Sequence, residues 1–131
     1  MTPYAELAVT TNFSFLRGAS HAEELVQRAA ELGLAGIGIA DRNSFAGVVR
    51  AHVAAKDFYL KFFVGVRLVT TDGFETLAYP MDRAAYSRLS RLLTRGNRRA
   101  KKGECHLFFE EILEFSEGQI FIVLPLSLIH I

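Results

Sequence analysis

The sequence is poor in cysteine and has no long apolar run. Cys105 is the single cysteine in 131 residues, so no disulfide can form within the chain, and a reducing cytoplasmic compartment is the expected one. The first residues lack a basic stretch followed by an apolar core, which argues against a signal peptide. The apolar runs are all far shorter than the roughly 20 residues of a membrane-spanning helix, so we expect no membrane partner.

Neither sign of charge dominates the composition. The chain has 15 lysines and arginines against 14 aspartates and glutamates, a formal net charge of +1. Such a balance gives no argument for a nucleic-acid or membrane partner, and the distribution of the charges matters more than their sum. Half of the residues are hydrophobic, enough for the core of one domain of this length.

The chain begins with a strand, a helix and a second strand. Residues 4–10 alternate loosely between apolar and polar side chains and predict a short strand. Ser20 and Glu23 have the spacing of a capping box, and the helix that starts there is expected to end at Gly33 in a left-handed cap. Residues 34–40 form an apolar run that is too short for a helix, which predicts a strand covered on both faces.

Polar residues gather where these two strands end. A crossover helix between parallel strands places both carboxyl ends at one edge of the sheet, where α/β proteins build their sites. We therefore expect the residues that follow the two strands to lie near one another. They are Thr10, Asn12, Asp41, Arg42 and Asn43.

A second helix and a hairpin come next. Residues 46–57 predict a helix with Val48, Val49 and Val53 toward the sheet. His52 is assigned to the same face, and we interpret it as a helix residue rather than a ligand. Residues 62–69 and 74–79 have the composition of strands, and the Asp-Gly pair between them predicts a hairpin turn.

The last third of the chain predicts two more helices and a strand. Asp82 is placed to cap a helix with an apolar stripe. Residues 119–126 look like a buried strand. A short helix over residues 107–115 is expected between them, with inward side chains at Leu107, Phe108, Ile112, Leu113 and Phe115.

Residues 83–102 hold eight basic side chains and no acidic one. Such a segment can bind phosphates, with an affinity that falls as salt rises. The favoured interpretation is a solvated helix face paired with the glutamates of residues 104–117, because no aromatic residues are interleaved for base stacking. Contact with DNA or with a polymerase domain is the second interpretation. Besides Arg83, the basic residues are Arg88, Arg91, Arg95, Arg98, Arg99, Lys101 and Lys102.

Two specific stretches carry a family resemblance, NFSFLRGASH at residues 12–21 and RAKKGECHL at residues 99–107. From about Tyr4 to Pro125 the chain resembles the polymerase and histidinol phosphatase (PHP) domain that opens bacterial C-family DNA polymerases, and most closely the error-prone, translesion branch. The resemblance implies an α/β fold, a partial, distorted (β/α) barrel that is incomplete at the C-terminus. It covers residues 1–125 as one PHP-like domain, and residues 126–131 are expected to be an unrelated or truncated tail.

The resemblance also implies where metal ligands would lie. Metal-binding PHP domains place a His-x-His pair near the end of the first strand, an Asp-His pair after the second and a glutamate after a Gly-x sequence. Histidine and carboxylate side chains are the ligands that divalent cations need. The matching positions hold Ala8, Thr10, Asp41, Arg42 and Arg67, so only one ligand type is left.

We therefore expect a vestigial site with no metal, no cofactor and no catalytic residue. Two arginines would bring fixed positive charge to the place of the cations. We expect an arginine to pair with Asp41 instead. The implied function is that of the N-terminal module of an error-prone DNA polymerase, in replication past lesions and DNA repair. Its partners are the remaining domains of the parent polymerase, with DNA as a second partner through the basic segment.

The alternative function is a metal-dependent phosphoesterase or proofreading nuclease of the same superfamily. It requires a ligand cluster around Asp41, for which His21 and His106 are the conceivable additional ligands. Both histidines are better explained as a first-turn surface residue and a scaffold residue. Whether the chain itself is an enzyme is left open by its sequence, since the polymerase active site lies outside it.

Overall fold

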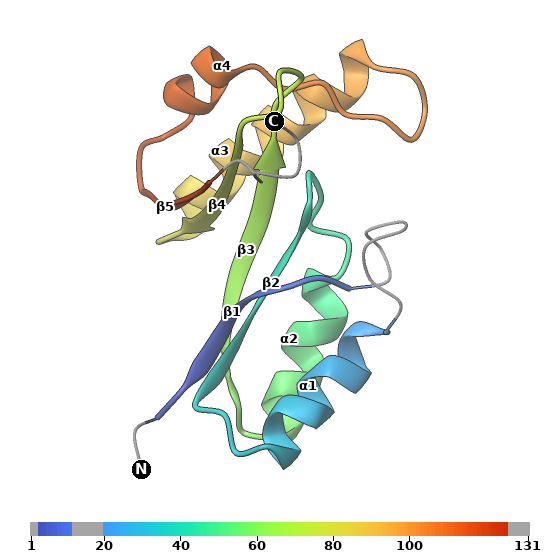
Figure 1. Cartoon of the computed structure of the whole chain (residues 1–131), viewed down its shortest axis with the longest axis vertical. Helices are drawn as coiled ribbons and strands as arrows, with labels where there is room; N and C mark the ends of the chain where they lie inside the picture. The colour runs from blue at the N-terminus through green and yellow to red at the C-terminus, as the bar shows by residue number, and fades with distance from the viewer. Residues whose placement is uncertain (1–2, 12–19, 126–131) are drawn as a thin grey trace. The chain divides into compact units, whose positions relative to one another are not determined.

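A computed structural model describes residues 3–11 and 20–125 of the chain. The chain divides into two compact units, Met1–Val66 (unit 1) and Arg67–Ile131 (unit 2), and each is described by itself (Figure 1). The described strands follow one another in the order β1-β2-β3-β4-β5. In the described part of the chain, none of the helices is both long and apolar enough to cross a membrane.

Unit 1 contains β1 (Ala5–Val9), α1 (Ala22–Glu31), β2 (Gly36–Arg42), α2 (Val48–Asp57) and the first part of β3 (Lys61–Val69). β1 and β2 pair in parallel, as the crossover through α1 predicts. Gly33 has a φ of 72°, and its amide and that of Leu34 donate to Ala30 and Ala29, which confirms the left-handed cap. The capping box at Ser20 is wrong: α1 begins one residue later than it requires, with His21 as an N-cap that makes no side-chain cap bond.

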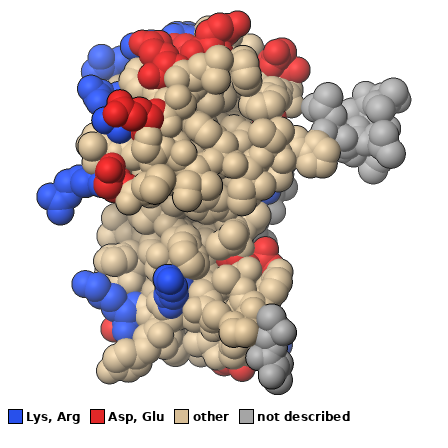
Figure 2. Space-filling view, turned by 90° about the vertical axis from the view of Figure 1, so that its left-hand side faces the viewer, with Lys and Arg blue, Asp and Glu red and all other residues tan. Residues whose placement is uncertain are grey.

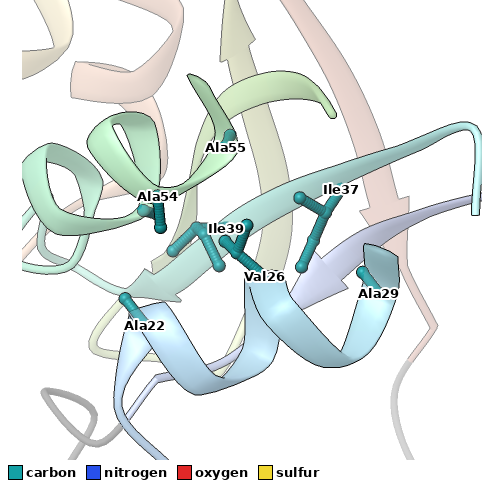
Figure 3. Close-up of a cluster of buried hydrophobic side chains, with 8 residues drawn as sticks. Ala22, Val26, Ala29, Ile37, Ile39, Ala54 and Ala55 are labelled. Atoms are coloured by element: carbon teal, nitrogen blue, oxygen red, sulfur yellow. The ribbon is translucent and has the colours of Figure 1, made fainter. Parts of the chain in front are cut away.

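The core of unit 1 lies where α1 and α2 cover β2 (Figure 3). Ile37 and Ile39 on β2 pack with Val26 of α1 and with alanines of both helices. All of β2 except its last residue is buried, which confirms a strand covered on both faces. The predicted inward face of α2 was partly wrong, because Val49 is 72% exposed and Val53 is 55% exposed. Small alanines at 51, 54 and 55 form that face instead and let the two helices pack closely.

Unit 2 contains the end of β3, β4 (Glu75–Pro80), α3 (Arg83–Arg99), α4 (Phe109–Glu114) and β5 (Gln119–Leu124). The hairpin between β3 and β4 is confirmed, with Gly73 at a φ of 94° in its turn. Asp82 caps α3 as predicted, because its Oδ1 accepts from the amide of Ala85 at 2.8 Å. β5 pairs antiparallel with β4.

The core of unit 2 is formed by α3, β4 and the segment before α4. Leu89, Leu92 and Leu107 are fully buried. Gly96 lets that segment approach α3, since a Cβ at this position would lie 2.6 Å from Leu107 Cδ2 and 2.7 Å from Cys105 Sγ. Ile112 is also buried, as predicted.

Three expectations for unit 2 are corrected. Phe108 and Leu113 are not inward, with 42% and 58% of their surfaces exposed. β5 is not a buried strand, since Ile120 and Val123 are both more than half exposed. β4 pairs with β5 along one edge of β5 only. The residues of β5 are therefore partly or fully exposed.

Candidate functional site

The edge of unit 1 where β1 and β2 end is the first candidate site. Glu6 pairs with Ile37, but Val9 pairs with Ile39, so β1 takes three steps where β2 takes two. An extra residue of this kind is a β-bulge, and it displaces every later residue of the strand by one position. Thr11, rather than Thr10, therefore comes to lie beside Asp41.

Asp41 is a buried carboxylate that Thr11 holds at both oxygens. The Thr11 amide donates to Oδ1 at 2.7 Å and the Thr11 hydroxyl donates to Oδ2 at 2.7 Å. Asp41 is 1% exposed and Thr11 is fully buried. A buried charge is tolerated only where hydrogen-bond donors replace water, and Thr11 supplies two such donors, both neutral.

The N-terminus of α2 closes this arrangement from the other side. A Cβ on Gly47, the N-cap of α2, would lie 2.8 Å from Asp41 Oδ2 and 2.9 Å from Thr11 Oγ1. Only a glycine leaves room for so close an approach. The positive end of the helix dipole also faces the carboxylate there and stabilises its charge. We call Thr11, Asp41 and Gly47 the Asp41 clasp.

The other predicted residues of this site are placed as follows. Ala8 lies in β1, and Thr10 directly follows that strand at the same edge as Asp41. Arg42 is the exposed last residue of β2, and Asn43 follows it with a φ of 47°. Asn12 lies outside the described residues. Thr10, Asp41 and Arg42 lie at the carboxyl ends of the two parallel strands β1 and β2.

Arg67 belongs to unit 2. Its guanidinium lies 3.9 Å from Glu75 Oε1, across the hairpin of β3 and β4. The ion-pair partner of this arginine is therefore Glu75, and the pairing of an arginine with Asp41 stays a prediction. The distance of 3.9 Å is too long for a hydrogen bond, so the contact between Arg67 and Glu75 is a weak ion pair.

The residues at this edge do not fit a metal cluster. Among residues 3–11 and 20–125, no three His, Cys, Asp or Glu side chains come together in a way that could hold a cation. Each oxygen of Asp41 already accepts a hydrogen bond from Thr11. His21 caps α1, and His106 Nε2 lies 3.3 Å from Glu104 Oε2, so neither histidine belongs to a described ligand group.

Thr11 is the residue that sequence reasoning missed. The resemblance places ligands at Ala8 and Thr10 of this segment. The bulge that shifts the register by one residue cannot be recognised from the amino-acid composition. The pair of glycines in β2 was the one available signal. A Cβ on Gly38 would lie 2.8 Å from the carbonyl oxygen of Leu7, so this glycine permits the irregular pairing.

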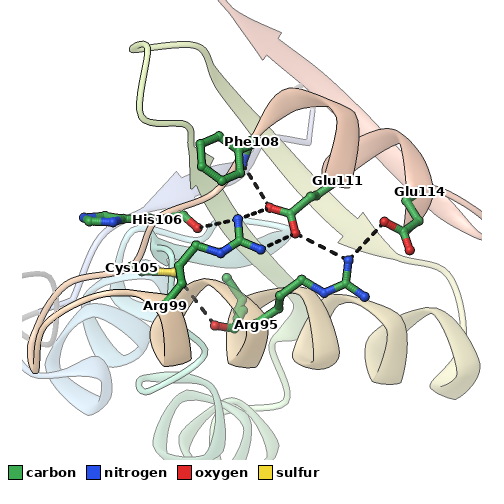
Figure 4. A network of polar contacts seen from close by, with 8 residues as sticks. Arg95, Arg99, Cys105, His106, Phe108, Glu111 and Glu114 are labelled. Atoms are coloured by element: carbon green, nitrogen blue, oxygen red, sulfur yellow. Dashed lines mark hydrogen bonds and ion pairs between the residues drawn. The ribbon is translucent and has the colours of Figure 1, made fainter.

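The second candidate site is a network of charges in unit 2 (Figure 4). Arg99 of α3 donates to both oxygens of Glu111 on α4, at 2.6 and 2.7 Å. Arg95 reaches Glu111 at 3.4 Å and Glu114 at 3.1 Å. Glu111 also accepts from the amide of Phe108 at the start of α4, which fixes the helix end. Arginine and carboxylate pair strongly in this bidentate form.

The network shifts the pKa values of its members. The hydrogen bonds from Arg99 lower the pKa of the Glu111 carboxyl below its ordinary value, because they favour the charged form. The same contact raises the pKa of Arg99. Burial raises the pKa of the Cys105 thiol. Cys105 is therefore a partly buried thiol beside Gly96 whose surroundings favour the neutral form.

Comparison with known proteins identifies the family. Residues 6–127 match the PHP domain. The chain belongs to the PHP domain family. The α/β fold class and the PHP type of partial barrel are thereby confirmed.

The PHP domain described here is similar to part of several curated polymerases. It is 58% identical over 123 residues to the error-prone DNA polymerase of Caulobacter vibrioides, with 93% of this chain covered. It is 56% identical over 119 residues to the error-prone DNA polymerase of Rhodopseudomonas palustris, with 87% of the chain covered. The chain spans only 11% and 10% of the lengths of these two relatives.

Two solved structures share the fold of this PHP domain. A putative metal-dependent phosphoesterase from Bifidobacterium adolescentis superposes with a TM-score of 0.63 at 25% identity, over 75% of this chain and 34% of the other. An amidohydrolase from Chromobacterium violaceum, solved with bound sulfate and no metal, gives a TM-score of 0.62 at 22% identity, over 72% and 33%. The second likeness concerns the fold alone.

Proposed function

We propose that this PHP domain is the N-terminal module of an error-prone DNA polymerase and supports that polymerase without performing metal chemistry. The proposal extends to replication past lesions and DNA repair in the cytoplasm, and the remaining polymerase domains are its partners. The high identity to error-prone polymerases over 87–93% of the chain supports the assignment. DNA polymerisation itself needs carboxylates that bind metal elsewhere in such a protein.

The single observation that carries the loss of metal chemistry is the Asp41 clasp. Of the five matched positions, Asp41 alone has the side chain of a metal ligand, and Thr11 donates to both of its oxygens. To bind a cation, the carboxylate would have to give up two short buried hydrogen bonds. Ala8 offers no lone pair, and Arg42 and Arg67 carry positive charges.

The clasp gives this edge a structural role instead. It ties the end of β1 to the end of β2 and to the start of α2, three elements that come from separate parts of unit 1. A rigid edge of this kind is what a supporting module offers to the domains that pack on it. The cation-binding pocket of the family has become a set of internal hydrogen bonds.

Metal analysis tests the proposal. The full-length protein is purified without chelator, incubated with manganese or zinc, desalted and analysed by elemental mass spectrometry. A phosphodiesterase assay with the same metals and primer extension across a template lesion are run on the same samples. We expect the metal content of Asp41→Asn to differ from that of the wild type by less than about 0.1 per chain, with no phosphodiester hydrolysis that depends on Asp41 and active lesion bypass.

The alternative function, a metal-dependent phosphoesterase, is favoured by the likeness to the Bifidobacterium protein. Stoichiometric metal that is lost in both Asp41→Ala and Asp41→Asn, and kept in the exposed control Asp57→Ala, would establish the alternative and overturn the proposal. The asparagine variant is included because it is nearly isosteric with aspartate and keeps one acceptor for Thr11.

A further inference from the structure

The arginines of α3 fall into two groups according to their partners. Arg88 lies 3.6 Å from Glu117, while Arg95 and Arg99 are held by the glutamates of α4. Within residues 3–11 and 20–125, Arg91 and Arg98 have no ion pair or hydrogen bond of their side chains. Pairing with the glutamates of residues 104–117 therefore applies to Arg88, Arg95 and Arg99, whereas Arg91 and Arg98 are left for contact with DNA or a polymerase domain.

Among the described residues Arg83, at the start of α3, also has no such partner, whereas Arg91 and Arg98 share one face of the helix. They are seven residues apart, which is two helical turns and about 10 Å along the axis. With Thr94, Arg95 and Arg99 they line a shallow depression of about 630 Å³. Figure 2 shows basic side chains beside the acidic ones on the surface of unit 2. We call the depression around Arg91, Thr94 and Arg98 the α3 strip.

The aromatic rings near the strip are already occupied. The Arg95 guanidinium lies 4.9 Å from the Phe115 ring centre, and that of Arg99 lies 4.8 Å from the Phe108 ring centre. None of the residues that line the depression is aromatic. The strip therefore offers charge and hydrogen-bond donors but no free ring on which a base could stack.

We propose that the α3 strip binds the phosphodiester backbone of duplex DNA through Arg91 and Arg98. The proposal rests on the proposed function, because the DNA is that on which the parent polymerase acts. A separation of about 10 Å along the helix axis is short enough for the two long arginine side chains to reach separate phosphates of one strand. Binding of this kind positions a duplex and reads no sequence.

The acidic helix α4 defines the limit of the contact. Glu111 and Glu114 neutralise Arg99 and part of Arg95, so among the residues that line the depression the uncompensated positive charge lies on Arg91 and Arg98. A ligand that spread toward α4 would meet glutamates, whereas one strand of a backbone can follow the strip alone. The network therefore selects which arginines a phosphate reaches.

A salt titration of DNA binding tests the strip. Fluorescence anisotropy of a labelled 20-base-pair duplex is measured with the full-length protein between 50 and 200 mM salt. Arg91→Gln combined with Arg98→Gln is expected to weaken binding at 50 mM salt on the order of tenfold. The slope of log K against log salt is expected to fall in magnitude by about 2, which is about 1 for each arginine that no longer neutralises a phosphate.

The controls separate this contact from net charge and from folding. Lys56→Gln combined with Lys61→Gln removes the same charge from exposed positions of unit 1, outside α3, and it is expected to leave the slope within about 0.3 of the wild type. Arg91→Lys with Arg98→Lys keeps the charge and is expected to recover most of the affinity. Circular dichroism checks that each variant remains folded.

Three outcomes would overturn the proposal that the α3 strip binds duplex DNA. They are equal weakening in the glutamine pair and its control, an unchanged slope, and a loss confined to single-stranded DNA. An unchanged slope with a lower melting temperature would show that the face packs on another domain of the protein, which also rejects DNA binding. Metal content and lesion bypass are measured separately, so a failed strip leaves the proposed function standing, and a failed proposed function is recognised by its own assay.

Discussion

The two units hold their central carboxylates in opposite ways. Asp41 in unit 1 is buried and accepts hydrogen bonds from the neutral amide and hydroxyl of Thr11. Glu111 in unit 2 lies near the surface and accepts from the guanidinium groups of Arg99 and Arg95. The first arrangement depends on close packing, and the second depends on charge. Their responses to mutation, pH and salt should therefore differ.

The largest effect is expected from Asp41→Ala. The substitution leaves the Thr11 amide and hydroxyl buried without this acceptor, and each unsatisfied group costs about 1–3 kcal/mol. We expect unit 1 to lose about 2–5 kcal/mol of stability, measured by urea unfolding. Hydrogen exchange should become faster at the amides of β1 and β2 and stay unchanged in α3. Asp57→Ala, at the exposed end of α2, is the matched control. A loss below about 0.5 kcal/mol would show that the clasp is not a structural element.

A methyl group at either tightly packed glycine should have the next largest effect. Gly47→Ala places a Cβ 2.8 Å from Asp41 Oδ2, and Gly96→Ala places one 2.6 Å from Leu107 Cδ2. Overpacking of this kind costs about 1–3 kcal/mol, although alanine favours a helix over glycine. Chemical denaturation measures the loss, with Asn97→Ala on the exposed face of α3 as the control. A neutral or stabilising Gly96→Ala would mean that the segment before α4 moves away freely.

A smaller effect, and one that depends on pH, is expected at Glu111. Its pKa is lowered in the folded protein, so its contribution to stability is present above its ordinary pKa of about 4.5 and is lost as the pH falls through the folded value. Glu111→Gln should lower the melting temperature of unit 2 by a few degrees, about 2–5 °C, at neutral pH. The two melting curves should converge as the pH is lowered below about 4. Glu110→Gln is the control on the same helix. Parallel curves at all pH values would contradict the assignment.

The smallest effect is expected from Glu114→Gln. Its pair with Arg95 is exposed on both sides, with side chains that are 56% and 44% accessible. Exposed pairs contribute about 0–1 kcal/mol and are screened by salt. The melting temperature should fall by about 1 °C or less at 50 mM salt and by nothing measurable at 500 mM. A larger loss that salt does not reduce would place this pair with the buried clasp rather than with the surface network.

The sequence predicted much of the fold because local rules applied. Gly33 and Asp82 ended and began helices as their chemistry requires, and the apolar run before Asp41 became a buried strand. Apart from the capping box at Ser20, the errors concerned which side of an element faces the core and not whether the element exists. Val49 and Val53 are apolar but point outward, because alanines fill the narrow space between α1 and α2. Hydropathy alone does not indicate how large a side chain the space between two helices can hold.

The candidate sites were harder to predict because they depend on tertiary packing and strand register. Asp41 was placed at the right sheet edge by the strand order, but its partner Thr11 depends on a local register that only the glycines of β2 hint at. The basic segment was recognised by its composition. Which of its arginines would meet a glutamate depended on how α4 packs on α3, a tertiary contact that spacing along the chain does not contain.

The extra residue in β1 has a consequence for the evolutionary history that is open to this domain. Because Val9 and not Ala8 lies beside Ile39, the side chain two residues on that reaches Asp41 is Thr11. A histidine gained by point mutation at position 8 or 10 would find the carboxylate already engaged by its neighbour. Under the proposed function, single histidine substitutions would therefore not restore a metal site at this edge, because Asp41 would also have to be released from Thr11.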